Sequence, residues 1–227
     1  MIRGANGQAR WHELWTGLPY IYGPNDSGEC DSITNGSNAR PYIEAKSQRQ
    51  WTWREYRPPR GDICLNREQT EYGSMNSGRL ILQPQLKHRP DAVNKSWPWR
   101  YWNKLAWLLQ NRGLKVTQIG PSGTPLIDAV EFIETRDFRH AAAVISKARL
   151  LITQEGGCHH LAAVYRTKAV VIFGGFISPA VTGYEDQVNL FVGDGLGCGM
   201  RVPCDHCEKA MRDITPEKVE TEALRLL

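Results

Sequence analysis

The residues best suited to chemistry lie in one short stretch between two apolar runs, at 150–153 and 168–173. They are an acid, two glycines and two histidines: Glu155, Gly156, Gly157, His159 and His160. A glycine turn that leads into a helix exposes backbone N–H groups at the positive end of the helix dipole. Such a turn binds anions, above all phosphate. The stretch therefore predicts an anion site between a buried strand and a helix.

Strands and helices that alternate from residue 78 onward must position this turn. We expect strands at 79–83, 115–119, 131–134, 150–153, 168–173 and 188–192, and helices at 97–111, 137–147, 159–165 and from 215 onward. Asp137 and Thr215 are the expected N-caps, Pro98 suits a first helical turn, and Gly113 suits a C-terminal cap. This alternation predicts an α/β fold with a Rossmann-like parallel sheet, whose ligands bind at the carboxyl ends of the strands.

The first 77 residues have a different character, rich in turn-forming residues and tryptophan. We expect short strands at 20–22, 41–44 and 62–65, and one helical turn at 11–15. The sequence thus predicts a small, irregular, aromatic-rich subdomain at 1–77 and a Rossmann-like domain at 78–227. The Trp/Arg mixture at 50–57 could stack on sugar rings or bases, although core packing is the commoner role of such residues.

The composition, with 41% hydrophobic and 23% charged residues, is that of an ordinary globular protein. No run approaches the roughly 20 apolar residues of a membrane span, and the N-terminus does not resemble a signal peptide. We therefore expect a cytoplasmic protein. The net charge of +4 permits nucleic-acid binding without indicating it. The oligomeric state stays open.

Three of the six cysteines lie close together near the C-terminus. Cys198, Cys204 and Cys207, with His206, could bind zinc, because Cys-x-x-Cys is a metal-ligand spacing. Only one such pair is present, so reduced packing cysteines or a local disulfide are the favoured interpretation. A zinc-stabilised interaction protein is one alternative function.

Four motifs in order resemble glycosyltransferase family 9, the lipopolysaccharide heptosyltransferases. The first is Leu-Ile-Leu-Gln-Pro at 80–84, with Lys-Ser-Trp-Pro at 95–98. The second is Asp-Phe-Arg-His-Ala-Ala-Ala-Val-Ile at 137–145. The third is Gln-Glu-Gly-Gly-Cys-His-His-Leu-Ala-Ala at 154–163, with Lys-Ala-Val-Val-Ile-Phe-Gly at 168–174. The fourth is the tail, with Pro-Cys-x-x-Cys at 203–207 and a following Thr-Pro. The resemblance covers residues 78–227.

The resemblance implies the GT-B fold of two Rossmann-like halves, of which the C-terminal half binds a nucleotide-sugar donor. Lys95 would meet donor phosphate, and Glu155, Gly156, Gly157 and His160 would line the pyrophosphate site. Three further residues are candidates for the same site: His159, Gly174 and Gly175. A packing or surface role is the alternative for His159, and a plain loop is the alternative for the two glycines.

The expected reaction is transfer of a sugar from a nucleotide-diphosphate donor to an unknown acceptor hydroxyl, with no cofactor and no metal in the chemical step. This chain has glutamate at 155 where the family has aspartate, and cysteine at 158 where the family has proline. The family's catalytic aspartate lies in a full first half, for which we expect only an abbreviated counterpart here. The catalytic base is not identified, and a nucleotide or nucleotide-sugar binding module without turnover is the main alternative.

Overall fold

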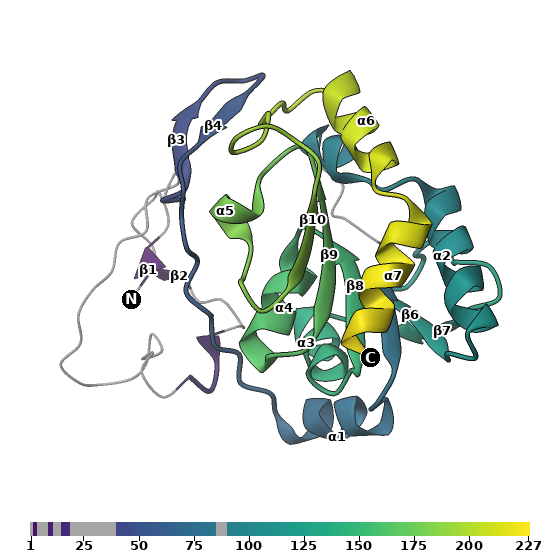
Figure 1. Cartoon of the computed structure of the whole chain (residues 1–227). Coiled ribbons are helices and arrows are strands. Elements are labelled where there is room, and N and C mark those ends of the chain that lie inside the picture. Colours follow the sequence, from purple (N-terminus) through teal and green to yellow (C-terminus); the bar gives the residue numbers. More distant parts are fainter. Residues whose placement is uncertain (1, 4–8, 11–14, 19–39, 85–89) are drawn as a thin grey trace.

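The computed structural model describes residues 2–3, 9–10, 15–18, 40–84 and 90–227, and a six-stranded parallel sheet forms its centre (Figure 1). The strands are β5 (Leu80–Gln83), β6 (Val116–Gly120), β7 (Glu131–Glu134), β8 (Leu150–Gln154), β9 (Ala169–Gly174) and β10 (Val188–Phe191). They lie side by side in the order β10-β9-β8-β5-β6-β7. All six predicted strands are confirmed, with ends that differ by at most one residue.

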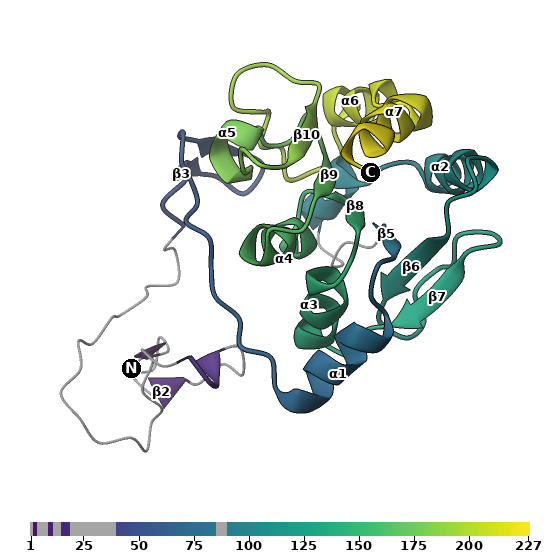
Figure 2. The same cartoon turned by 60° about the horizontal axis from the view of Figure 1, so that its bottom comes forward.

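Helices cover both faces of this sheet, as Figure 2 shows. On one side lie α2 (Trp99–Asn111), α6 (Asp205–Asp213) and α7 (Pro216–Leu226), and on the other lie α1 (Arg67–Met75), α3 (Phe138–Ser146) and α4 (Gly157–Tyr165). Every residue of β5, β6, β8 and β9 is buried, which explains why β5, β8 and β9 are largely apolar; β6 also buries the polar residues Thr117 and Gln118. The predicted α/β fold with a Rossmann-like parallel sheet is confirmed.

Local capping signals set the helix ends. The Asp137 carboxylate accepts a hydrogen bond from the backbone N–H of His140 at 2.8 Å, at the start of α3. The Thr215 hydroxyl caps α7 in the same way, and Gly113 follows α2 with a φ of +76°. These predictions are confirmed. Pro98 takes the N-cap position, one residue before the first turn in which it was expected.

Helix α1 is an element that the sequence analysis missed. Asn66 caps it by accepting from the N–H of Gln69 at 2.8 Å, while the Gln69 side chain accepts from the N–H of Asn66 at 2.9 Å. This Asn-x-x-Gln capping box is a recognisable signal. Gly73 of α1 lies directly against the backbone of Ala143, so α1 packs closely on α3. Helix α6 was also missed, and so was the short helix α5 (Pro179–Thr182).

The segment before α1 forms a hairpin and then an extended strap. Strands β3 (Ile43–Lys46) and β4 (Trp51–Trp53) pair antiparallel, so the strand predicted at 41–44 is shifted and β4 was not foreseen. The strand predicted at 62–65 is wrong, because this stretch is irregular backbone held by side chains such as Arg139, which donates to the Cys64 carbonyl. The predicted strand 20–22 and most of the turn 11–15 lie outside the described residues.

Two short strands complete the described N-terminal part, β1 (Ile2–Arg3) and β2 (Ala9–Arg10), which pair antiparallel. The buried Trp53 joins the sheet core and donates from its indole N–H to the carbonyl of Phe176 at 3.1 Å. The division of the chain at residue 78 stays a prediction. Among the described residues, no helix has the length and apolar character needed to cross a membrane.

Candidate functional site

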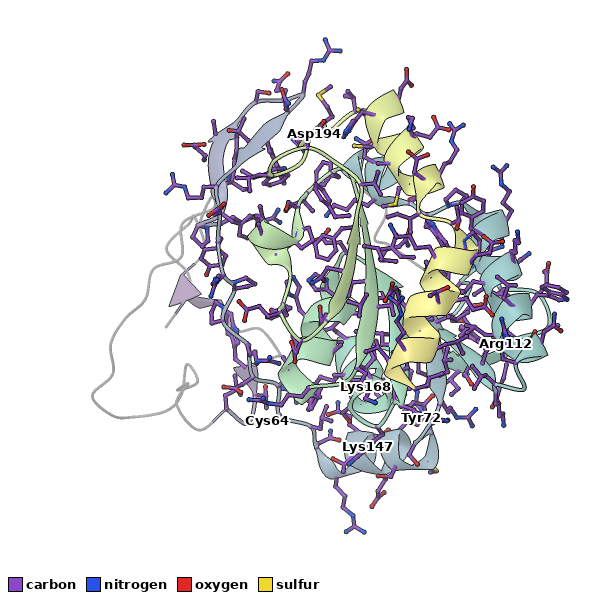
Figure 3. All side chains as sticks on the ribbon, in the orientation of Figure 1. Cys64, Tyr72, Arg112, Lys147, Lys168 and Asp194 are labelled. Carbon is purple, nitrogen blue, oxygen red and sulfur yellow. The ribbon has the colours of Figure 1, made fainter. Side chains whose placement is uncertain are left out.

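The chain reverses its direction of winding between two neighbouring strands, β5 and β8. After β5 the chain runs to α2 on one face of the sheet, and after β8 it runs to α4 on the other (Figure 2). Ligands of doubly wound folds bind at such a switch point, beyond the carboxyl ends of the strands. In Figure 3, Lys168 marks the end of the sheet where β9 begins, and Asp194 lies in the loop at the opposite end, where the strands finish. The predicted site residues belong to that second end.

Lys95 and Glu155 meet at this switch point, although they are 60 positions apart. Lys95 ends the 3-10 helix η2 (Pro90–Lys95), which follows β5, and Glu155 directly follows β8. The Lys95 ammonium donates to Glu155 Oε2. It also lies 4.9 Å from the centre of the Phe176 ring. The sequence proposed both residues for one site, and the fold brings them into direct contact.

Electrostatics keeps the Glu155 carboxyl ionised. Glu155 is 5% exposed, and burial alone would raise the pKa of its carboxyl. The adjacent Lys95 charge outweighs burial and lowers the pKa of Glu155 to about 2. The Thr182 hydroxyl donates a longer hydrogen bond to Glu155 Oε1 at 3.4 Å. Glu155 is therefore a fixed anion at neutral pH. Lys95 is the more accessible member of the pair, with its side chain 19% exposed against 6% for that of Glu155.

Trp97 and Asn94 hold Lys95 in place. The backbone N–H of Trp97 donates to the Gln154 side chain, and its indole N–H donates to the carbonyl of Ile214 at 2.7 Å. The Asn94 amide donates to the carbonyls of Met200 and Val202 at 2.5 and 2.7 Å. Both side chains are buried. The Lys-x-Trp-Pro motif thus has a structural reason, because its tryptophan anchors the segment that carries the lysine.

His159 is a buried structural histidine of the turn. Its Nδ1 accepts from the N–H of Gly156 at 3.0 Å, so its Nε2 carries the proton and donates to the carbonyl of Thr182 at 2.9 Å. Burial lowers the pKa of His159, which is fully enclosed. Glu155, His159 and His160 could in principle share a metal ion. The two backbone hydrogen bonds of His159 and the ion pair of Glu155 already occupy that set.

His160 lies beside His159, with ring centres 3.9 Å apart. Its Nδ1 pairs with the Tyr184 hydroxyl at 2.9 Å. Burial, followed by the neighbouring His159, lowers the pKa of His160 to about 3. The ring is therefore neutral at physiological pH. It has one N–H to donate and is not a proton carrier near neutrality.

The glycines differ in what requires them. A side chain at Gly157 would meet the Phe138 ring at 2.9 Å, so close packing of α4 on α3 requires this glycine. A side chain at Gly174 would meet Met211 at 2.7 Å, and one at Gly175 would meet the His206 ring at 2.9 Å. Both glycines therefore lie beneath α6. Their predicted contact with a ligand stays a prediction.

The strap at 54–60 lies along the site. The sequence indicated possible stacking on sugar rings or bases for 50–57, but it did not indicate residues 58–60. The N–H of Tyr56 donates to the carbonyl of Ala180 at 3.1 Å. Arg60 pairs with Asp186 at 2.9 Å and lies 6.0 Å from the ring centre of Tyr184. Thr182 and Tyr184 were also missed, although the strand-end rule applied to the segment after β9 would have indicated them. Nothing in the sequence around Arg60 indicates that this residue lies at the site.

The late cysteines form a second cluster. Cys198 Sγ lies 2.9 Å from Cys207 Sγ, and Cys207 Sγ lies 4.0 Å from His206 Nδ1. Cys204 completes the group. The hydrogen bond between the two thiols lowers the pKa of Cys198 and raises that of Cys207. Cys64 lies elsewhere in the fold, where its thiol donates to the carbonyl of Gly17 at 3.0 Å.

Comparison with known proteins assigns a family to the part of the chain that contains the site. Residues 62–208 match the model of Glycosyltransferase family 9 (heptosyltransferase). No curated protein matches the chain.

Similar solved structures include the ADP-heptose lipopolysaccharide heptosyltransferase II of E. coli, with 18% identity and a TM-score of 0.52 over 72% of this chain and 52% of that one. A family 9 glycosyltransferase from Veillonella parvula has 14% identity and a TM-score of 0.55, over 72% and 53%. The iron-containing dodecameric glycosyltransferase TibC of enterotoxigenic E. coli has 17% identity and a TM-score of 0.53, over 66% and 46%. This chain spans about half the length of these proteins.

Proposed function

Because this chain belongs to glycosyltransferase family 9, we propose that it binds a nucleotide-diphosphate sugar and transfers the sugar to an acceptor hydroxyl, with no metal in the chemical step. One observation carries the proposal. A lysine held in a buried ion pair stands at the switch point of the sheet, close to the N-terminus of α4. A fixed cation and free helix N–H groups are what a departing diphosphate requires.

The proposed reaction is a displacement at the anomeric carbon of the sugar. The acceptor oxygen forms a bond to this carbon, the bond to the diphosphate oxygen breaks, and the nucleoside diphosphate leaves with the electron pair. Lys95 has three N–H donors and Glu155 Oε2 accepts from one, so others can reach phosphate oxygens. The charge that develops on the leaving group is stabilised by Lys95 and by the first N–H groups of α4.

Glu155 acts through Lys95 in this proposal. Its carboxylate carries the same sign of charge as a diphosphate, so direct contact between the two would be repulsive. The ion pair instead fixes the position of the Lys95 ammonium. Glu155 is thus a positioning residue. This role differs from the direct lining of the pyrophosphate site that the family resemblance implied.

The proton of the acceptor hydroxyl goes to a base outside this group of residues. A general base works best with a pKa near the operating pH. Glu155, with a pKa of about 2, and His160, with a pKa of about 3, are both too weak. In this proposal His160 Nδ1 accepts from the Tyr184 hydroxyl, and the single N–H of the ring, on Nε2, donates toward the diphosphate.

A binding module without turnover is the second candidate, because the chain spans about half the length of its solved relatives. The two functions are separated by incubating the full chain with ADP-, GDP-, UDP- and CMP-sugars. Thermal unfolding reports binding, and nucleotide release reports transfer or donor hydrolysis. A ligand at 100 times its dissociation constant adds about 2.7 kcal/mol of stability. Binding with neither transfer nor hydrolysis would favour the binding module.

Three variants connect this test to Lys95. Lys95→Met is expected to weaken binding of the stabilising nucleotide at least tenfold, about 1.4 kcal/mol. Lys104→Met removes a lysine from an exposed ion pair with Glu217 and is expected to leave binding unchanged. The double variant Lys95→Met/Glu155→Gln removes both charges, so it separates lost binding from lost stability. Equal affinities for all four proteins would refute the phosphate role of Lys95.

A further inference from the structure

The cysteine cluster at the start of α6 has the composition of a metal site. Cys198 comes from the loop after β10, while Cys204, His206 and Cys207 come from the N-terminal end of α6. Each residue offers one ligand atom, and all four atoms lie within 4.8 Å of one another. We propose that these three thiolates and one imidazole bind a single zinc ion with a structural role.

The distances suit tetrahedral coordination. Zinc–sulfur bonds of about 2.3 Å place two sulfur ligands of one tetrahedron about 3.7 Å apart. Cys198 Sγ and Cys207 Sγ are 2.9 Å apart, so binding requires them to separate by less than about 1 Å. The Cys207 Sγ to His206 Nδ1 distance of 4.0 Å needs little change. Side-chain rotation supplies these movements without a change of fold.

The chemistry of the ligands selects the metal. Three cysteines and one histidine form a closed structural zinc set, with no open position for a substrate. Thiolates exclude hard ions such as magnesium and calcium. Cys204 is the N-cap of α6 and Cys207 lies in its first turn, where the helix dipole stabilises negative sulfur. Zinc binding by this set was the less favoured interpretation of the sequence, because only one Cys-x-x-Cys pair is present.

The cluster lies where a metal ion would connect the Cys198 loop to α6, close to the residues that position Lys95. The N–H of Cys198 donates to the carbonyl of Gly175 at 3.0 Å, and the N–H of Gly199 donates to the carbonyl of Phe176 at 3.0 Å. The Phe176 ring lies beneath the Lys95 ammonium, and α6 also contacts η2. A zinc ion would fasten the loop that carries Cys198 to α6. It would thereby stabilise the Phe176 ring and η2, which both position Lys95. The proposed zinc site does not depend on the proposed reaction.

A disulfide between Cys198 and Cys207 is the competing state, since their sulfurs are already close. Such a disulfide would not explain why Cys204 and His206 also lie within 4.8 Å of the same sulfurs. The full chain, purified untagged under reducing conditions, is therefore analysed for metals by mass spectrometry and for free thiols. We expect one zinc ion per chain. Absence of metal, or a Cys198–Cys207 disulfide in the purified protein, would overturn the site, and one iron ion in place of zinc would overturn the choice of metal.

Variants assign the metal to these residues. Cys204→Ser and His206→Ala alter side chains that are not fully buried, so both proteins are expected to fold and to lose at least half of the zinc. Cys64→Ser is the matched control and is expected to keep the full equivalent. Cobalt added to the metal-free chain reports the ligands directly, because tetrahedral thiolate coordination gives intense absorption bands. Retention of zinc by both Cys204→Ser and His206→Ala would refute the assignment.

Discussion

Removing the positive charge of Lys95 should destabilise the protein through Glu155. The pKa of Glu155 falls from an ordinary value of 4.5 to about 2 in the folded protein. Each pKa unit corresponds to about 1.4 kcal/mol, so this ionisation contributes about 3 kcal/mol to folding at neutral pH. Lys95→Met leaves the carboxylate buried and unpaired, and breaking such a pair costs about 3–5 kcal/mol. We expect a loss of about 3 kcal/mol at pH 7.

The pH dependence provides a second, signed prediction. In the wild-type chain the contribution of Glu155 is complete above pH 4.5 and is lost as the pH falls toward 2, because the folded-state pKa is lowered. In Lys95→Met, burial without a cation raises the pKa of Glu155 above its ordinary value. The folded variant then binds the extra proton, and its stability falls as the pH rises. The difference from wild type should grow between pH 5 and pH 7.5.

The assay is urea unfolding followed by tryptophan fluorescence, with the variants Lys95→Met, Glu155→Gln and the double variant. The double variant should recover at least about 1 kcal/mol relative to the sum of the single losses, and it should lose the pH dependence. Lys104→Met breaks the exposed pair with Glu217 and should cost no more than about 1 kcal/mol. A loss in Lys95→Met that matches this control, or that does not vary with pH, would refute the reasoning.

Three further predictions concern packing and protonation. Gly157→Ala should cost about 1–3 kcal/mol in urea unfolding, because its Cβ would lie 2.9 Å from Phe138, and adding Phe138→Leu should restore part of this loss. Gly199→Ala should cost at least as much in the same measurement, since the residue has a φ of +63° and its Cβ would collide with the Trp51 carbonyl. His160, with a pKa of about 3, should contribute no step to the pH profile of nucleotide binding between pH 5 and 8, so a step removed by His160→Gln would contradict this assignment.

Much of the fold could be predicted because its signals are local. Strands β5, β8 and β9 are apolar runs that only a sheet covered on both faces can bury. The caps of α3 and α7 depend on a side chain and an N–H three residues away. Helix α1 carries an equally local signal, the Asn66–Gln69 capping box, so its start is also encoded in the sequence.

The candidate site likewise has a part that is local in sequence and a part that depends on contacts between distant residues. The sequence by itself identified the glycine turn and helix start at 155–160, because a turn and the helix after it are continuous along the chain. Tertiary structure alone decided which groups stand opposite: Lys95 against Glu155, Tyr184 against His160, and Cys198 against His206 and Cys207. These contacts depend on β5 lying beside β8 and on the loops after β9 and β10 folding over the sheet end. Strand order and loop packing result from burial of the whole core, which no single stretch of sequence encodes.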